Sequence, residues 1–401
     1  MARLKEGEGK TPPGPFRPEF WKSPLRGRRL TAILGLVLLV GMGIVLITGF
    51  LSHIAYNPDL RGNAIVDPAR DLPINFDWPT SPSWLFALTQ GLHVTIGLVM
   101  VPILLTKLWS VMPRLFAWPP ASTPAQAIER GSVALLVSST IFLIATGLFN
   151  AQYWYPFNFG FVAAHYWAAV IFLGSFLLHV AIKLPLVVRH YRGRDHDEPD
   201  LLKAARPAPA TISRRGLLAF TGAGAGLVLV GNAGQAIGGP FRKIAFLAPR
   251  RESGFPVNKT AMAAGIKPEM TGSTYRLELG NVSLSREQLL AMPQHTESLP
   301  IACVEGWSAT RSWTGVRLSD LAKMAGVPDA GEVYVQSLQE SGGFRKASLS
   351  RDQINDSRSM LALKVEGEDL SMDHGFPARV IVPALPGVHN TKWVASMEFT
   401  A

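Results

Sequence analysis

The chain of 401 residues is rich in apolar residues, with 48% hydrophobic and 17% charged residues and a formal net charge of +10. Its length allows roughly two or three domains, and the concentration of apolar residues before residue 240 excludes an ordinary soluble protein. Basic residues gather beside the apolar stretches, so the charge is a topology signal and indicates no nucleic-acid partner.

Four apolar stretches in the first half are long enough to cross a hydrocarbon core, which takes about 20 residues. They cover residues 30–52, 84–106, 133–153 and 161–182, and a fifth stretch, 216–237, is rich in glycine and alanine. Buried helices of soluble proteins rarely run this long without a charge, so the sequence predicts membrane-spanning helices in contact with a lipid bilayer.

The flanking charges predict the orientation in the membrane. Eight basic residues precede the first stretch and eight follow the fourth, whereas residues 53–83 hold four aspartates against two arginines. Basic loops stay in the cytoplasm, so the N-terminus is expected inside and the C-terminal part outside a bacterial plasma membrane, on the periplasmic side.

The fold expected from this topology is a multi-domain one. It combines an N-terminal α-helical transmembrane four-helix bundle, a fifth anchoring helix and a C-terminal α+β domain. The predicted segments are a cytoplasmic segment (1–29), the four-helix transmembrane domain (30–190), a cytoplasmic linker (191–215), the fifth helix (216–238) and an extracytoplasmic domain (239–401).

Ser213-Arg214-Arg215, directly before the fifth stretch, resembles a twin-arginine export signal. That route carries proteins already folded around a cofactor, so the resemblance implies a cofactor in the C-terminal domain. The glycines of "GAGAG" lie within an apolar stretch, which disfavours a phosphate-binding loop. Small residues at 231–239 offer a cleavage site, but an uncleaved anchor is favoured because it keeps the two halves joined.

Four histidines lie in or beside the apolar stretches: His53, His93, His165 and His179. His165 and His179 are 14 residues apart, which places them on one helix face about 21 Å apart along the axis. A four-helix bundle with such histidines can hold haem iron by two axial imidazoles. Hydrogen bonding between helices, or a proton path, is the alternative role.

This pattern resembles the b-type cytochrome subunits of hydrogenases and formate dehydrogenases over about residues 20–190. The resemblance implies one or two b haems. His93 with His165 is the favoured axial pair, and the partner of His179 is left open between His53 and neither. His53 lies at the outer end of its stretch, whereas the first-helix ligand of that family tends to lie at the cytoplasmic end.

The region after residue 240 alternates short β-rich runs such as "TYRLELGNVSL" and "ARVIVPAL" with turns, which predicts an α+β domain. It contains the only cysteine of the chain, Cys303, which cannot form an internal disulfide. Cys303 is therefore a small buried hydrophobe, a nucleophile or a metal ligand. A thiolate can complete a metal site when the cofactor supplies the remaining sulfurs.

"IACVEGWSATRSWTGVRLSDL" resembles the molybdenum-ligand segment of the sulfite oxidase family, and residues 372–399 resemble its pterin-binding segment. The resemblance covers about residues 255–401 and implies a molybdenum–molybdopterin cofactor with Cys303 as its protein ligand. It further implies cofactor contacts from Asn258, Gly306, Trp307, His389, Asn390, Thr391, Lys392 and Trp393. Arg379 is either structural or a pterin contact, and Asn258 either a pterin donor or a turn residue.

The catalytic candidates are Cys303, Arg345 and His389, with Arg345 and its neighbour Lys346 able to attract an oxyanion. The predicted function is oxygen-atom transfer on a small oxyanion, S-oxide or N-oxide, with electrons relayed by b haem to or from a membrane quinone. The alternatives are a sulfite-type dehydrogenase, a haem-only electron-transfer or ferric-reducing module without molybdenum, and a binding module on a membrane anchor.

Overall fold

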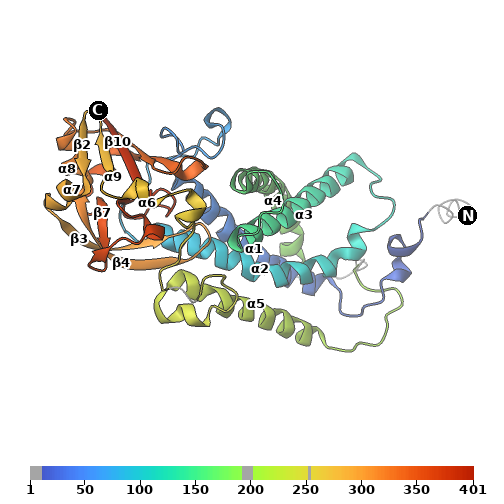
Figure 1. The fold of residues 1–401 in the computed structure, drawn as a ribbon. Coiled ribbons are helices and arrows are strands. Elements are labelled where there is room, and N and C mark those ends of the chain that lie inside the picture. Colours follow the sequence, from blue (N-terminus) through green and yellow to red (C-terminus); the bar gives the residue numbers. More distant parts are fainter. Residues whose placement is uncertain (1–10, 192–201, 252–253) are drawn as a thin grey trace, which may run out of the picture. The chain divides into compact units, whose positions relative to one another are not determined.

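The computed structural model describes residues 11–191, 202–251 and 254–401 (Figure 1). The predicted cytoplasmic segment 1–29 and linker 191–215 lie partly outside these residues. The described chain divides into two compact units. The first combines Met1–Leu46 with Ile96–Leu229, and the second combines Ile47–Thr95 with Val230–Ala401.

Five long helices form from the apolar stretches. They are α1 (Arg28–Ile54), α2 (Leu85–Leu115), α3 (Pro124–Ala151), α4 (Phe161–Tyr191) and α5 (Arg214–Ile237). Among the described residues, these five helices are long and apolar enough to cross a membrane, for α4 over Phe161–Pro185. The prediction of a helical N-terminal region with several apolar helices is confirmed.

Helices of the first unit pack closely through a small residue and a polar link. A Cβ on Gly41 of α1 would lie 2.2 Å from Met100 Sδ of α2, so the glycine allows the two helices to approach. Lys183 of α4 forms an ion pair with Glu129 of α3. This ion pair joins two neighbouring helices of the unit through their polar side chains.

The second unit contains two β-sheets. One has the strand order β2-β1-β10-β5-β6, and the other runs β3-β4-β7-β8, with β9 also paired to β7. β1 and β10 are parallel, and the other pairings of these strands are antiparallel. The strands are β1 (Arg276–Leu279), β2 (Val282–Ser285), β3 (His295–Ala302), β4 (Ser308–Arg317), β5 (Glu332–Ser337), β6 (Lys346–Ser350), β7 (Met360–Val365), β8 (Glu368–Asp369), β9 (Arg379–Ile381) and β10 (Val394–Thr400).

Short helices connect these strands, namely α7 (Arg286–Ala291), α8 (Leu318–Met324) and α9 (Arg351–Asn355), and α6 (Pro268–Thr271) precedes β1. α7 begins with a capping box, in which Ser285 pairs with Gln288, and at the start of α9 Ser350 N donates to Gln353 Oε1 at 3.0 Å. A serine followed three residues later by glutamine satisfies two main-chain N–H groups at a helix start. Local sequence therefore sets where both helices begin.

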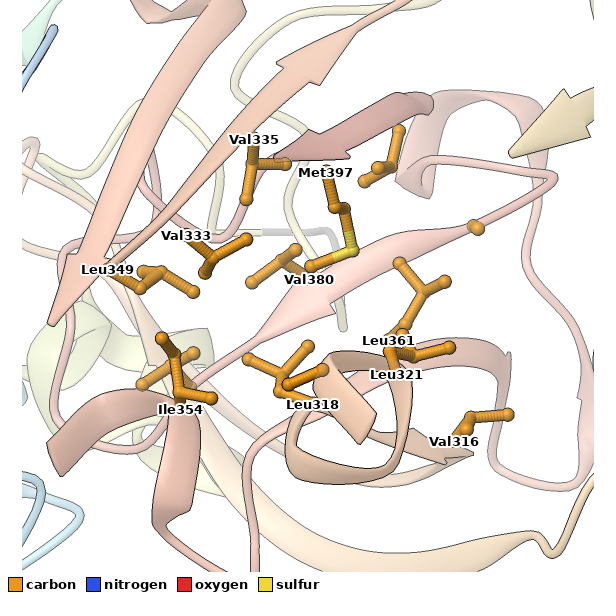
Figure 2. Close-up of a cluster of buried hydrophobic side chains, with 14 of the residues drawn as sticks. Val316, Leu318, Leu321, Val333, Val335, Leu349, Ile354, Leu361, Val380 and Met397 are labelled. Atoms are coloured by element: carbon orange, nitrogen blue, oxygen red, sulfur yellow. The ribbon is translucent and has the colours of Figure 1, made fainter. Parts of the chain in front are cut away.

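The core of the second unit lies between the two sheets. Val333 and Met397 reach it from one sheet, Leu361 and Val380 from the other, and Leu318 from α8 (Figure 2). All five side chains are fully buried. The predicted C-terminal domain with β-sheet is confirmed.

The segment 47–95 contributes to this core although it precedes the sheets by about 200 residues. Trp78 is 2% exposed, and its Nε1 donates to Ala384 O at 2.8 Å. Asn63 exchanges two hydrogen bonds with the main chain of Ser348, at 2.9 and 2.8 Å. The second unit is therefore complete only when residues between α1 and α2 pack against the sheets.

Candidate active site

Cys303 lies directly after β3, in a tight turn that leads into β4. Cys303 N donates to Trp307 O at 2.9 Å, and Gly306 N donates to Cys303 O at 3.0 Å. Gly306 has φ +91°, which side chains disfavour. The Cys303 side chain is buried, and burial followed by the nearby Glu305 carboxylate raises the pKa of the thiol. The protein without a metal therefore holds a neutral thiol, whose proton a soft metal ion would replace.

Cys303 lines a pocket built from four separate parts of the second unit. The other lining residues are Pro256, Val257, Asn258, Ile301, Trp307, Asp373, His374, Arg379, Gly387 and Lys392. Among the residues predicted to bind a cofactor, the structure thus brings together Asn258, Cys303, Trp307 and Lys392. Arg379, whose role was left open, also reaches the pocket.

Two cationic side chains give the pocket its charge. Arg379 is buried and donates to Asn390 O at 3.2 Å and to His374 O at 3.1 Å. Lys392 Nζ donates to the main-chain oxygens of Lys259 and Asp373. Burial lowers the pKa of Arg379 to about 9, and burial together with Arg379 lowers that of Lys392 to about 7.

Neither cation forms an ion pair with a carboxylate among the described residues. Within the described residues both side chains donate to main-chain carbonyls, and the Asp373 carboxylate acts on Lys392 through its charge without a direct ion pair. Burying such charges is costly unless an anion joins them. The pocket is therefore suited to an anionic ligand beside a thiol.

His374 and Asp373 line the pocket but were missing from the sequence prediction. The His374 ring stacks on Phe255, with 3.9 Å between ring centroids, and its Nδ1 lies 2.8 Å from Ser371 Oγ. Burial, followed by the charge of Arg379, lowers the pKa of His374 to about 4, so the ring is neutral at pH 7. The pair directly precedes "GFPAR" within the resembling segment, a signal that could have found it.

Four other predicted cofactor contacts lie beside the pocket without lining it. Asn390 Oδ1 accepts from Val382 N at 2.8 Å, and Thr391 Oγ1 lies 3.5 Å from His389 O. The Trp393 Nε1 donates to a main-chain oxygen at 2.7 Å. Burial lowers the pKa of His389 to about 4. These side chains stabilise the segment that carries Lys392.

Arg345 and Gly306 also lie outside the pocket lining. Arg345 is in an exposed turn before β6, where its Nη1 donates to Glu340 O at 3.1 Å. Gly306 faces α2 instead, because a Cβ there would lie 2.9 Å from Val94 Cβ. The absence of a side chain at Gly306 therefore allows α2 to lie close to the turn that contains Cys303.

The segment 47–95 contacts the Cys303 turn directly. Gln90 Nε2 of α2 donates to Val304 O. Tyr56, which follows α1, packs its ring edge-on against His389 with 5.0 Å between centroids. Hydropathy alone gave no sign of these contacts, because it identifies spans and not what the residues between them touch.

The histidines predicted as haem ligands differ in their surroundings. His93 Nδ1 lies 3.5 Å from Thr48 Oγ1, and His165 Nδ1 lies 2.8 Å from Thr146 Oγ1. His53 instead places Nε2 at 2.9 Å from Asp71 Oδ2, in a buried pair. His179 Nδ1 is buried and has no hydrogen-bond partner within the described residues.

Residues 264–401 match the family described as oxidoreductase molybdopterin binding domain. This part of the chain is a molybdopterin-binding oxidoreductase domain. The prediction of a molybdopterin-binding oxidoreductase domain in the C-terminal part is thereby confirmed. The match covers the two sheets and most of the pocket, including Cys303, Arg379 and Lys392.

Related proteins include several oxidoreductases. The uncharacterized oxidoreductase YuiH of Bacillus subtilis is 34% identical over 29% of this chain and 58% of its own length. Sulfite oxidase of Arabidopsis thaliana is 33% identical over 22% of this chain and 26% of its own length. The putative protein-methionine-sulfoxide reductase subunit YedZ1 of Azospira oryzae is 27% identical over 33% of this chain and 51% of its own length. The chain thus spans between about a quarter and three fifths of these relatives.

The pKa of Lys392 makes the stability of the metal-free molybdopterin-binding domain depend on pH. Its folded pKa of about 7 lies below the ordinary 10.5, so between these values the unfolded chain binds a proton that the folded domain does not. Stability from this group therefore rises with pH, by at most about 1.4 kcal/mol per unit. We expect Lys392→Met to remove this rise between pH 7 and 8.5, measured by pulse proteolysis in urea.

Lys267→Met, at an exposed lysine outside the pocket, is the matched control and should keep the wild-type slope. Subtracting the slope of stability against pH of one variant from that of the other cancels the contributions of the other titrating groups. Equal slopes for Lys392→Met and wild type would contradict the burial of this cation.

Proposed function

We propose that the chain is a membrane-bound oxidoreductase that reduces an S-oxide by oxygen-atom transfer at a molybdenum cofactor, with electrons supplied by membrane quinol through b-type haem. The observation that carries the proposal is the buried Cys303 thiol in a pocket with two cations, within a domain of the molybdopterin-binding family. The relative named as a putative protein-methionine-sulfoxide reductase subunit favours an S-oxide substrate.

The pocket fits the cofactor by the chemistry of its donors. Cys303 would hold the metal as a thiolate, and Lys392 and Arg379 would bind the anionic parts of the pterin. Asn258 and Trp307 would complete the walls. When bound, the cofactor supplies two-electron oxygen-atom transfer, which protein side chains cannot perform themselves.

The chain's own residues would bind the anionic groups and exclude water from the pocket. Trp307 Nε1 donates to Glu305 at 2.6 Å, which holds the indole as a wall of the pocket. The exposed Arg345 would attract the substrate from solvent. The neutral His389 would lie beside the pocket and stabilise the segment that carries Lys392. Gly306, Asn390, Thr391 and Trp393 would shape the backbone around the cofactor.

The reaction balances with two electrons and two protons. The S–O bond of the substrate breaks, its oxygen leaves as water, and the sulfide is released. One quinol supplies both electrons and both protons and becomes quinone. Quinol would give up its electrons and protons at the membrane helices, because quinones are confined to the bilayer.

The proposed topology keeps the predicted boundaries. Residues 30–190 would form a four-helix cytochrome b domain, 216–238 an uncleaved anchor and 239–401 the extracytoplasmic catalytic domain. The flanking basic residues support a cytoplasmic N-terminus, and Arg214 and Arg215 would act as the export signal. One haem would be held by His93 and His165, with His179 and His53 as candidate ligands of a second.

The test uses purified full-length protein whose haem has been reduced with quinol. Addition of methionine sulfoxide should re-oxidise the haem, seen as loss of the reduced b-type absorbance. Failure of re-oxidation in protein that contains both molybdenum and haem would refute the reductase direction. Protein without haem would refute the relay, and protein without molybdenum would favour the haem-only module.

A second candidate function is the reverse direction on sulfite. It is favoured by the 33% identity to Arabidopsis thaliana sulfite oxidase and by the cations of the pocket, which suit an oxyanion. In this direction sulfite would reduce the oxidised haem in the same sample. Reduction by sulfite without re-oxidation by the sulfoxide would make the protein a quinone-reducing dehydrogenase.

A further inference from the structure

The chain reverses direction directly after α5 and runs back along that helix. A short 3-10 helix, η4 (Gly239–Ile244), begins just after α5 ends at Ile237. Leu247 N then donates to Gly231 O at 2.8 Å, so the chain has returned to a residue that lies well before the end of α5. At a rise of about 1.5 Å per residue, Gly231 lies about 9 Å back along the helix axis from Ile237.

Two glycines of α5 allow the returning chain to lie close. A Cβ on Gly234 would overlap Phe241 O, and a Cβ on Gly231 would lie 2.9 Å from Phe246 Cζ. The first overlap involves the main chain, which cannot move aside as the end of a side chain can. Residues 241–247 therefore lie against the last turns of α5, beginning beside Gly234 and ending beside Gly231.

This returning segment has one face toward the protein and one face toward the outside. Arg242 is buried, and its Nη2 donates to Ser308 O at the start of β4. Phe241, Ile244 and Phe246 instead have exposed fractions of 52%, 53% and 45%. Side chains three residues apart on a 3-10 helix point the same way, so Phe241 and Ile244 share the outer face. Large apolar side chains are thus presented together on the outside.

The apolar surface of α5 continues onto this face. α5 is long and apolar enough to cross a membrane, and its residues Val230 and Ile237 are exposed. Residues 238–251 contain no Asp or Glu, and Lys243 is exposed. Exposed aromatic and aliphatic side chains with a neighbouring cation suit the boundary between acyl chains and phosphate headgroups.

The length of α5 indicates how deep the returning segment would lie. Its 24 residues give a helix about 36 Å long, against a hydrocarbon core of about 30 Å. When the helix is centred in the core, a point about 9 Å from its end lies about 6 Å inside the core. That depth matches the depth of segments that lie in the membrane interface.

We propose that residues 241–247 form an interfacial membrane segment, whose exposed apolar side chains lie among the acyl chains of the leaflet on the side of the catalytic domain. This inference rests on the topology of the proposed function, since it requires α5 to cross the membrane. Ser308 Oγ donates to Ala236 O of α5, and Ser308 O accepts from Arg242. The segment therefore holds the start of β4, and with it the turn that contains Cys303, near the membrane surface.

The test is electron paramagnetic resonance of a nitroxide label that collides either with oxygen, which concentrates among acyl chains, or with a nickel chelate, which stays in water. Phe241→Cys, Ile244→Cys and Phe246→Cys are made separately in the full-length protein, labelled and reconstituted in phosphatidylcholine vesicles. Oxygen should relax all three labels more than the nickel chelate does. Cys303 is 2% exposed and should take up no label, which labelled wild-type protein checks.

Two further labelled positions in the same unit are the controls. Met324 is an exposed apolar residue at the end of α8, which follows β4 at the end opposite Ser308. β4 is about 30 Å long, so the Met324→Cys label should be relaxed more by the nickel chelate than by oxygen. Val230→Cys reports on α5 itself and should be relaxed more by oxygen.

The outcomes separate the inference from the topology on which it rests. Greater relaxation by the nickel chelate at the three segment positions, with the oxygen result at Val230, would place the segment in water and overturn the inference alone. Weak relaxation by both reagents at those positions would show that protein, such as a second copy of the chain, covers the segment, and would also overturn it. Greater relaxation by the nickel chelate at Val230 would overturn the membrane crossing of α5 and the inference together.

Discussion

On the proposed function, replacing Cys303 by serine is expected to abolish oxygen-atom transfer and leave the absorbance of the proposed haem unchanged. The thiol is the only one in the chain, and it is buried in the pocket of the molybdopterin-binding domain. A serine hydroxyl keeps nearly the same shape, but it does not ionise near neutral pH and is a poor ligand for a soft site. Turnover should therefore fall to the level of protein without molybdenum.

The measurement combines methionine sulfoxide reduction by purified protein with molybdenum content and the reduced-minus-oxidised haem spectrum. Ser298→Ala is the control, since Ser298 is an exposed residue of β3 five positions before Cys303. It should retain wild-type activity. Full activity in Cys303→Ser would exclude the thiolate as the metal ligand.

Truncating Trp78 to alanine should destabilise the second unit by about 3–5 kcal/mol, the range for large buried side chains. Trp78 is 2% exposed and lies in the core between the sheets, although it comes from the segment between α1 and α2. The change also leaves Ala384 O without its indole donor. Pulse proteolysis in urea, on detergent-solubilised full-length protein, measures the loss.

Two further variants make this result specific. Trp78→Phe keeps most of the volume and should cost about 1–3 kcal/mol through the unpaired carbonyl. Ile74→Ala removes an exposed apolar side chain of the same segment and should change stability by less than about 0.5 kcal/mol. Equal effects of Trp78→Ala and Ile74→Ala would show that the segment does not contribute to the core.

The sequence allowed the long helices to be predicted, because an apolar run of bilayer length has few other structures available. Their ends were less accurate. The apolar stretch 84–106 becomes α2, which continues to Leu115, and the stretch 133–153 becomes α3, which begins at Pro124. The main-chain hydrogen bonds of a helix continue into the polar residues that flank its apolar stretch. Hydropathy does not reveal these bonds, so it gives helices that are too short. Thr123, whose side chain accepts from Gln126 N, was the local signal for the start of α3.

The sequence pointed to a candidate site residue where one residue type has few chemical roles, and it gave no such pointer where folding brings distant residues together. Cys303 could be singled out because a lone thiol has few roles. Arg379 could not be placed, since only the pairing of β9 with β7 brings it to the pocket. Gln90 and Tyr56 gave no signal at all, because their partners lie more than 200 residues further along the chain.

The contribution of Trp78 to a core that closes around Ala384 has a consequence for how the protein is made. The two residues are 306 positions apart, and β10, which lies in the middle of its sheet, is synthesised later still. At roughly 5–20 residues per second, the ribosome needs about 15–60 s to pass from one to the other. During that interval the apolar side chains of the early segment have no partner strands. Synthesis of the protein therefore requires that the apolar side chains of this segment be kept from water until the sheets have been synthesised.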